Sequence, residues 1–189
     1  MKNTLTTAIR LTLVCIGCFC FLFPLLIWGI AQLSPGNGKG ETQLVNGHTY
    51  YVNVGQQFTS DRYFWSRPSA VNYNAAGSAG SNKGPSNPEY LETVQQRIDT
   101  FLVHNPGIGR EAIPVDLITA SGSGLDPHLS VQGALVQVKR IGKVRGLSES
   151  ELRKLVEKHT EKPLLGLFGP ERINVLQLNL ELDQAIKNK

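Results

Sequence analysis

Residues 11–33 read LTLVCIGCFCFLFPLLIWGIAQL, a run of 23 positions without a charged side chain. A helix rises 1.5 Å per residue, so this run is about 35 Å long, enough to cross the roughly 30 Å hydrocarbon core of a bilayer. Most of its side chains are Leu, Ile, Phe or Val, which favour insertion even with Pro24 and Gly29 present. The sequence therefore predicts one N-terminal transmembrane helix over residues 11–33.

The basic residues near this span predict its orientation. Lys2 and Arg10 precede the span, and the first basic residue after it is Lys39. The positive-inside rule then leaves residues 1–10 in the cytoplasm and the rest of the chain on the extracytoplasmic side of the plasma (inner) membrane. A cleaved signal peptide is the alternative, because residues 29–31 offer small side chains. The apolar run exceeds the usual 7 to 15 residues of such peptides, which favours a retained anchor.

The cysteines and histidines predict neither a disulfide scaffold nor a metal site. The three cysteines all fall inside the span, and the four histidines show no metal-ligand spacing. A domain exported without disulfides must be stabilised by its hydrophobic core, and about 150 residues suffice for one core. The cysteines are Cys15, Cys18 and Cys20, and the histidines are His48, His104, His128 and His159.

Charge excludes nucleic acid as a partner. Of the 19 Lys and Arg, two precede the span, so 17 stand against 15 Asp and Glu after it. That near balance gives no basic surface for a phosphate backbone. One basic run, KRIGKVR at residues 139–145, has two interpretations. It is the solvated end of a helix, or it is an interaction surface for anionic lipid or an acidic partner.

The remaining chain is expected to be a linker over residues 34–48 and one extracytoplasmic domain of α/β (α+β) class over residues 49–189. Local signals predict its helices: Asn87 and Pro88 begin one, Ser130 another, and Ser148 with Glu151 a capping box. Residues 71–88 contain almost no large apolar side chain and predict a surface loop. Expected helices cover 88–104, 131–145 with Gly146 as the terminating residue, 148–159 and a short segment capped by Asn179; expected strands cover 49–58, 112–119 and 173–178.

One short segment carries the residue types of a hydrolase. Ser121, Ser123, Asp126 and His128 lie within eight residues, but neighbours in a tight turn seldom form a triad, and the glycine pattern of a nucleophile elbow is absent. The favoured interpretation is a structural or partner-contact loop, with catalysis or an ion site as alternatives. The glycine-rich residues 77–85 lack the G-K-[ST] of a phosphate loop. The aromatic residues 63–68 are expected to form a corner of the core, with a partner hot spot as the alternative.

Several motifs occur here in order and resemble one family. They are YFWSRPSA at 63–70, GSN at 80–82, GPSNP at 84–88, PVDLITASGSGLDPHLS at 114–130 and NVLQLN at 174–179. This set closely resembles the KdpC family, the C subunits of Kdp potassium-transporting ATPases, from the span to Asp183. The resemblance marks a structural or partner-contact motif whose residues are Arg67, Pro68, Ser81, Asn82, Asp116, Ser121, Ser123, Asp126 and His128.

The resemblance implies a non-catalytic subunit with one span and an extracytoplasmic domain. Its implied partners are a P-type ATPase subunit, a channel-like potassium-binding subunit and a small single-span subunit. It also implies a catalytic chaperone that raises the ATP affinity of the ATPase subunit, so ATP and K⁺ belong to the complex and this chain binds no cofactor. The predicted topology argues against direct ATP contact, because ATP is cytoplasmic. A membrane-anchored serine hydrolase and a receptor for a small ligand are the alternatives.

Overall fold

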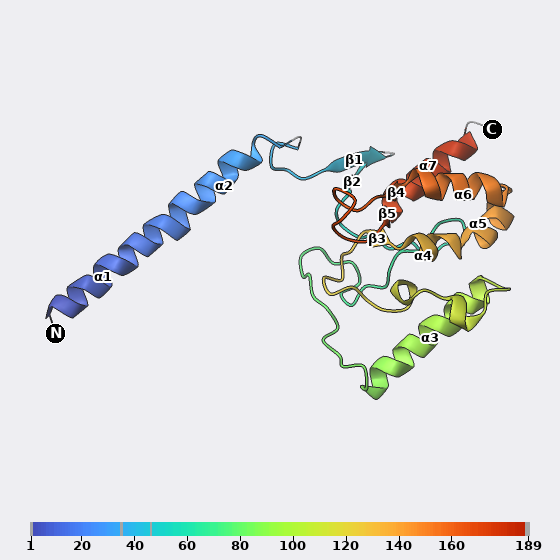
Figure 1. The fold of residues 1–189 in the computed structure, drawn as a ribbon, viewed down its shortest axis with the longest axis horizontal. Coiled ribbons are helices and arrows are strands. Elements are labelled where there is room, and N and C mark those ends of the chain that lie inside the picture. Colours follow the sequence, from blue (N-terminus) through green and yellow to red (C-terminus); the bar gives the residue numbers. More distant parts are fainter. Residues whose placement is uncertain (1, 35, 46, 188–189) are drawn as a thin grey trace. The chain divides into compact units, whose positions relative to one another are not determined.

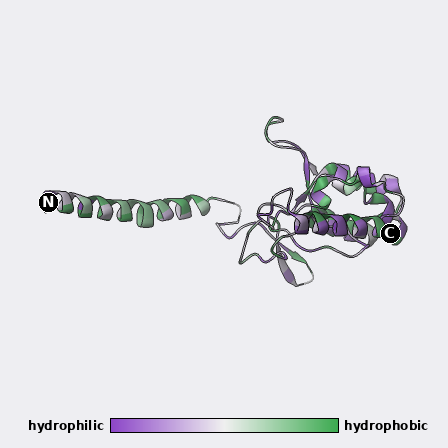
Figure 2. Cartoon of the chain, turned by 90° about the horizontal axis from the view of Figure 1, so that it is seen from below, coloured by the Kyte–Doolittle hydropathy of each residue, from purple (hydrophilic) through white to green (hydrophobic). Residues whose placement is uncertain are grey.

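The computed structural model describes residues 2–34, 36–45 and 47–187. The chain divides into two compact units, Met1–Tyr51 and Val52–Lys189 (Figure 1). The first unit begins with a continuous helix made of α1 (Lys2–Ile16), a π-helical turn (Gly17–Leu22) and α2 (Phe23–Ala31). Figure 2 shows this helix as apolar along most of its length. Within it, Asn3–Ala31 is long and apolar enough to cross a membrane, as the sequence predicts.

The π-helical turn ends two residues before Pro24 and includes Cys20, four residues before the proline. Proline has no amide hydrogen, and its ring clashes with the carbonyl four residues earlier in a regular α-helix. A wider turn relieves that clash without breaking the helix.

A hairpin completes the first unit. Strand β1 (Thr42–Val45) pairs antiparallel with β2 (His48–Tyr51), and Val45 lies opposite His48. Gly47 has a φ of 82°, which a tight turn between two strands favours. The strand expected over 49–58 is therefore wrong in its extent: it ends at Tyr51, and its partner lies inside the segment expected to be a linker.

The second unit is an α+β domain, which confirms the expected fold class. Its sheet has the order β3-β5-β4, with β5 paired antiparallel to both neighbours. Figure 1 shows the helices α4, α5, α6 and α7 near this sheet and α3 farther along the domain. The strands are β3 (His128–Leu129), β4 (Thr160–Glu161) and β5 (Arg172–Asn174); the helices are α3 (Pro88–His104), α4 (Val131–Leu135), α5 (Val138–Arg145), α6 (Glu149–Lys158) and α7 (Val175–Lys187).

One hydrophobic core joins these elements. Phe64 is fully buried in it, which confirms that residues 63–68 form a corner of the core. The other large side chains that are buried there come from α3, α5, α6 and α7 and from β3 and β5. They include Phe101, Leu129, Ile141, Leu152, Ile173, Leu178 and Leu182.

Local capping signals are confirmed where helices begin. The side chain of Asn87 accepts from the Tyr90 amide at 3.0 Å, and Ser148 forms the capping box with Glu151. Ser130 caps α4, and Gly146 ends α5 with a φ of 67°. The helix expected over 131–145 is divided, however, into α4 and α5.

One expected strand is wrong, and another is correct only in its first two residues. Residues 112–119 form no strand but two short 3₁₀ turns, Arg110–Ala112 and Val115–Leu117. Ile113 and Leu117 are the buried residues there, a spacing of one helical turn. In residues 173–178 the strand ends at Asn174, and α7 begins at Val175.

The side chain of Asn174 accepts from the Gln177 amide at 3.2 Å and so caps this helix. Asn179, the residue expected to cap it, lies inside α7. The surface loop expected over 71–88 is confirmed: residues 71–87 contain neither helix nor strand.

Candidate functional site

The predicted motif converges on one carboxylate. Arg67 Nη1 lies 3.0 Å from Asp126 Oδ2, and the other carboxylate oxygen accepts from the His128 amide at 3.0 Å. The His128 imidazole Nδ1 lies 3.3 Å from the same oxygen. The hydrogen bond from His128, opposed by partial burial and aided by Arg67, lowers the pKa of Asp126 to about 2. This carboxylate is therefore charged at every physiological pH.

The second nitrogen of His128 faces another carboxylate. Nε2 lies 3.9 Å from Glu161 Oε2, and Glu161 in turn accepts from Arg172 Nε at 2.8 Å. Because His128 is in β3, Glu161 in β4 and Arg172 in β5, the three strands of the sheet bring these groups together. Both ring nitrogens are thus directed at carboxylates rather than at a serine hydroxyl.

The two serines hold the loop instead. Ser123 Oγ accepts from the Leu125 amide at 3.1 Å and lies 3.5 Å from Ser121 Oγ. The carbonyl of Ser123 accepts from Ser78 Oγ, and that of Gly124 from Ser69 Oγ, at 3.0 and 2.6 Å. These bonds tie residues 121–124 to the glycine-rich loop that follows the aromatic corner.

Glycine is required where these two loops meet. Gly124 has a φ of 68°, and a Cβ there would lie 2.6 Å from Val71 Cγ2 and 2.8 Å from the Ala79 carbonyl oxygen. A Cβ on Gly80 would lie 3.0 Å from the Gly122 carbonyl oxygen. The glycines therefore serve close loop packing.

The remaining motif residues occupy different positions. Asp116 Oδ2 accepts from the Ser130 amide at 2.7 Å, so it fixes the start of α4. Pro68 is half-buried, and Ser81 and Asn82 are exposed. Asn82 has a φ of 53°, a turn conformation that asparagine tolerates. The structure thus joins Arg67, Asp126 and His128 into one cluster. Ser121 and Ser123 hold the adjoining loop, Asp116 binds the start of α4, and Ser81 and Asn82 are exposed.

Tyr73 adds a contact that the sequence does not single out. Its hydroxyl donates to the Arg67 carbonyl at 2.7 Å, and burial raises its pKa to about 12, against an opposing effect of Arg97. The backbone of Arg67 is therefore held in place while its guanidinium meets Asp126.

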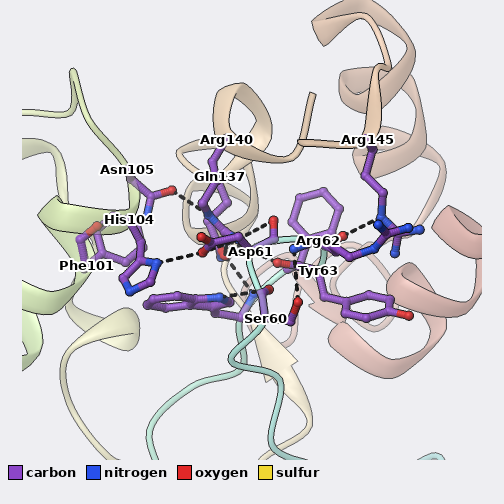
Figure 3. A network of polar contacts seen from close by, with 12 residues as sticks. Ser60, Asp61, Arg62, Tyr63, Phe101, His104, Asn105, Gln137, Arg140 and Arg145 are labelled. Carbon is purple, nitrogen blue, oxygen red and sulfur yellow. Dashed lines mark hydrogen bonds and ion pairs between the residues drawn. The ribbon is translucent and has the colours of Figure 1, made fainter. Parts of the chain in front are cut away.

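A second polar cluster centres on Arg140 (Figure 3). Only 6% of this residue is exposed. Its guanidinium donates to the carbonyls of Asp61 and Tyr63 at 2.7 and 3.1 Å, and to the side chains of Asn105 and Gln137 at 3.0 and 2.7 Å. Burial lowers the pKa of Arg140 to about 10, although the nearby Asp61 raises it. The group stays charged at neutral pH.

An aromatic ring and a histidine border this cluster. The Arg140 guanidinium lies 5.0 Å from the Trp65 ring centroid, and the His104 ring lies 4.9 Å from the same side chain. His104 Nδ1 lies 2.8 Å from Asp61 Oδ1. The cluster therefore attaches residues 61–65 to α3 and α5 at once.

The basic run at 139–145 was expected to be the solvated end of a helix or an interaction surface, and only part of it is exposed. Lys139 and Lys143 are exposed, but the side chain of Arg145 is 4% exposed and binds Asp183 Oδ1 at 2.7 Å. Its guanidinium also lies 4.6 Å from the Tyr63 ring centroid. Both arginines of the run are thus internal braces.

The polar side chains in these clusters are paired within the protein. No buried side-chain nitrogen or oxygen in the described part of the chain lacks a hydrogen-bond partner, and no group of three potential metal ligands occurs there. Sequence reasoning missed the roles of Asp61, Asn105 and Gln137, and it expected Asn179 only as a helix cap. Asn105, Gln137 and Asn179 are buried and Asp61 is partly buried, and these positions give the four residues their roles.

Comparison with known proteins finds matches over nearly the whole chain. A family model described as "K+-transporting ATPase, c chain" matches residues 5–184. A Flavobacterium johnsoniae protein is 55% identical to this chain, and the match covers 97% of this chain and 99% of that protein. A Bacteroides fragilis protein is 48% identical, and the match covers 99% of this chain and 100% of that protein. A Caldanaerobacter subterraneus protein is 45% identical, and the match covers 99% of this chain and 98% of that protein. Each of these relatives is named "Potassium-transporting ATPase KdpC subunit".

Proposed function

The chain belongs to the KdpC family of K⁺-transporting ATPase subunits, and on this premise we propose that it supports assembly and conformational cycling of the complex without catalysing a reaction. Family membership makes it an accessory subunit of a potassium-transporting ATPase, and the apolar helix Asn3–Ala31 fits a membrane protein. The finer role proposed here is that of a catalytic chaperone, which raises the ATP affinity of the P-type ATPase subunit.

The pairing of His128 is the observation that carries the non-catalytic part of this proposal. A hydrolytic triad needs a serine hydroxyl on one imidazole nitrogen and a carboxylate on the other. In this site Asp126 takes one nitrogen and Glu161 faces the other, while Ser123 Oγ accepts from a backbone amide. This arrangement of side chains fixes the loop, and it does not activate the Ser123 hydroxyl as a nucleophile.

The proposed orientation separates this chain from the nucleotide. With Lys2 and Arg10 in the cytoplasm, the domain after the span lies outside and ATP lies inside. Any effect on ATP affinity is then a coupling across the membrane. A subunit changes a conformational equilibrium only if it contacts the two states differently, so we propose state-dependent contacts with the partners.

The proposed partners are the P-type ATPase subunit, a channel-like potassium-binding subunit and a small single-span subunit. The span supplies contacts within the bilayer, and the domain supplies contacts at the outer surface. We assign the motif around Asp126 to structure or to partner contact in this assembly.

Isolation of the complex tests this function. The full chain, tagged at its C-terminus and extracted from native membranes in mild detergent, is expected to bring down the P-type ATPase and the potassium-binding subunit, with K⁺-stimulated ATPase activity in the eluate. The same tag on an unrelated single-span protein is the control. Recovery of the tagged chain free of both subunits would contradict the proposal.

A further inference from the structure

An apolar loop joins β4 to β5 at residues 163–170, hereafter the apolar loop. Four large side chains in it are strongly exposed: Leu164 at 69%, Leu165 at 81%, Leu167 at 81% and Phe168 at 64%. Single exposed leucines are common on protein surfaces, but four large apolar residues within five positions form a contiguous patch. Such patches mark interaction sites.

The loop has a defined backbone. The Leu164 amide donates to the Phe168 carbonyl and the Phe168 amide to the Leu164 carbonyl, both at 3.0 Å. The Gly166 amide donates a hydrogen bond to the Pro163 carbonyl at 2.9 Å, and the Leu167 amide donates one to the Leu164 carbonyl at 3.1 Å. A loop held in this way loses little conformational entropy when it binds.

Leu165 occupies a backbone conformation that disfavours leucine. Its φ is 55°, and that of Gly166 is 72°, so both central residues of the turn from Leu164 to Leu167 have positive φ. Turns of this kind favour Asn, Asp or Gly at these positions. Because the Leu165 side chain is exposed, no packing in the core offsets the strain of its backbone. An exposed leucine kept at a strained position points to a binding role.

We propose that the apolar loop docks into an apolar pocket on the extracytoplasmic surface of another subunit of the transport complex. This inference rests on the proposed function, which places the domain outside the membrane within a multi-subunit assembly. The leucines and Phe168 are the anchors, and the rigid turn presents them together.

Charge favours a protein partner over a lipid surface. The residues that flank the loop are Glu161 and Lys162 before it and Glu171 and Arg172 after it, so their charges cancel. Arg172 is moreover paired with Glu161 at 2.8 Å. Loops that bind anionic membranes combine apolar side chains with an excess of Lys and Arg. The loop lacks that excess.

The substitution Leu165→Asn tests the binding of partner subunits separately from the stability of the fold. Asparagine tolerates positive φ, so the melting temperature of the full chain in detergent is expected to stay unchanged or to rise. Co-isolation of the partner subunits is expected to fall at least fivefold. The matched control is Val103→Asn, an exchange of an apolar residue that is 77% exposed on α3, which should leave co-isolation unchanged.

Three outcomes overturn the inference: full co-isolation with Leu165→Asn, an equal loss with Val103→Asn, or a loss accompanied by a lower melting temperature, which would indicate a structural role. If the parent chain itself brings down no subunit, the proposed function fails together with the inference. The parent measurement thus distinguishes the two failures.

Photocrosslinking identifies the occupant. With benzoylphenylalanine in place of Leu167, irradiation of native membranes is expected to produce an adduct between this chain and another subunit of the complex. The same residue in place of Val103 is the control. Adducts with lipid alone would overturn the proposed partner in favour of the bilayer.

Discussion

Asn179 holds both backbone groups of Phe64. Its Oδ1 accepts from the Phe64 amide at 2.9 Å, and its Nδ2 donates to the Phe64 carbonyl at 2.9 Å. The carboxamide thus pairs with a buried peptide unit as a neighbouring strand would, although residues 63–68 belong to no sheet. One side chain of α7 therefore fixes the aromatic corner on which the core is built.

Replacing Asn179 should be costly. Asn179→Leu removes both partners of the buried Phe64 peptide, and an unpaired buried polar group costs about 1 to 3 kcal/mol, so we expect a loss of about 2 to 5 kcal/mol in unfolding free energy. Urea unfolding of the full chain, followed by Trp65 fluorescence in a Trp28→Phe background, measures it. Gln184→Leu, at an exposed position of the same helix, is the control. A loss no larger than that of the control would contradict the clamp.

Arg140→Lys should destabilise the domain by about 2 to 4 kcal/mol. Lysine keeps the charge, but its ammonium group cannot match the fork geometry with which the guanidinium reaches four acceptors. The same unfolding measurement applies. Lys143→Ala, at an exposed position of the same helix, should change stability by less than about 0.5 kcal/mol. Equal effects at the two positions would show that Arg140 is not a brace.

Asp126 makes stability depend on acid pH. Its pKa in the folded protein is about 2, below the ordinary 3.8, so the charged form stabilises the fold. This stability is fully present above pH 3.8 and is lost as pH falls towards 2. At about 1.4 kcal/mol per pKa unit, the contribution is about 2 kcal/mol.

The measurement compares the parent with Asp126→Asn between pH 7 and pH 2. The stability difference between the two is expected to narrow by about 2 kcal/mol over the acid range. Asp99→Asn, at an exposed position of α3, should show no such narrowing. A parent-to-variant difference that is independent of pH would mean that the charge of Asp126 contributes nothing.

The proposed topology predicts protease access from outside. In intact spheroplasts, added protease should degrade the chain after Ser34, while an epitope tag placed before Lys2 stays protected. Lysed spheroplasts, in which both ends are digested, give the control. Protection of the domain in intact spheroplasts would reverse the orientation and reopen direct contact with ATP.

The proposed coupling predicts no ATP site in this chain. Calorimetric titration of the detergent-solubilised full chain should show no binding at millimolar ATP. In the assembled complex, nucleotide should tighten the association of this subunit by the same factor by which the subunit tightens ATP, typically 5- to 150-fold. Specific sub-millimolar binding by the isolated chain would replace coupling with direct contact, and residues 77–85 would be its first candidate site.

Local signals were sufficient for the helices with strong ends. Asn87 and Pro88 start α3, and Ser148 with Glu151 starts α6, because capping bonds form between residues only three positions apart. The 23-residue apolar run likewise predicts a helix from composition alone, since no other part of the chain is needed to satisfy its backbone. The hydrolase-like segment is expected to serve the loop, on the argument that neighbours in a turn rarely form a triad, and this role stays a prediction.

Short apolar segments were beyond local inference. Residues 112–119 and 173–178 have the apolar content of strands, but a run of six to eight residues fits about two helical turns as well. The choice depends on what each segment packs against. Asp116 binds the start of α4, and Asn174 both caps α7 and donates to the Val52 carbonyl.

The sequence by itself determined the apolar span, the starts of α3 and α6, the loop-rich motif and the family, because each depends on composition, on order or on neighbours within a turn. Only the tertiary structure decided which hydrogen-bond partners the charged and amide side chains have. Arg140 meets the carbonyl of Asp61 from 79 positions away, and Asn179 meets Phe64 from 115. Burial turns these residues from solvated polar groups into internal braces, since a polar group removed from water must find its partners wherever the fold brings them.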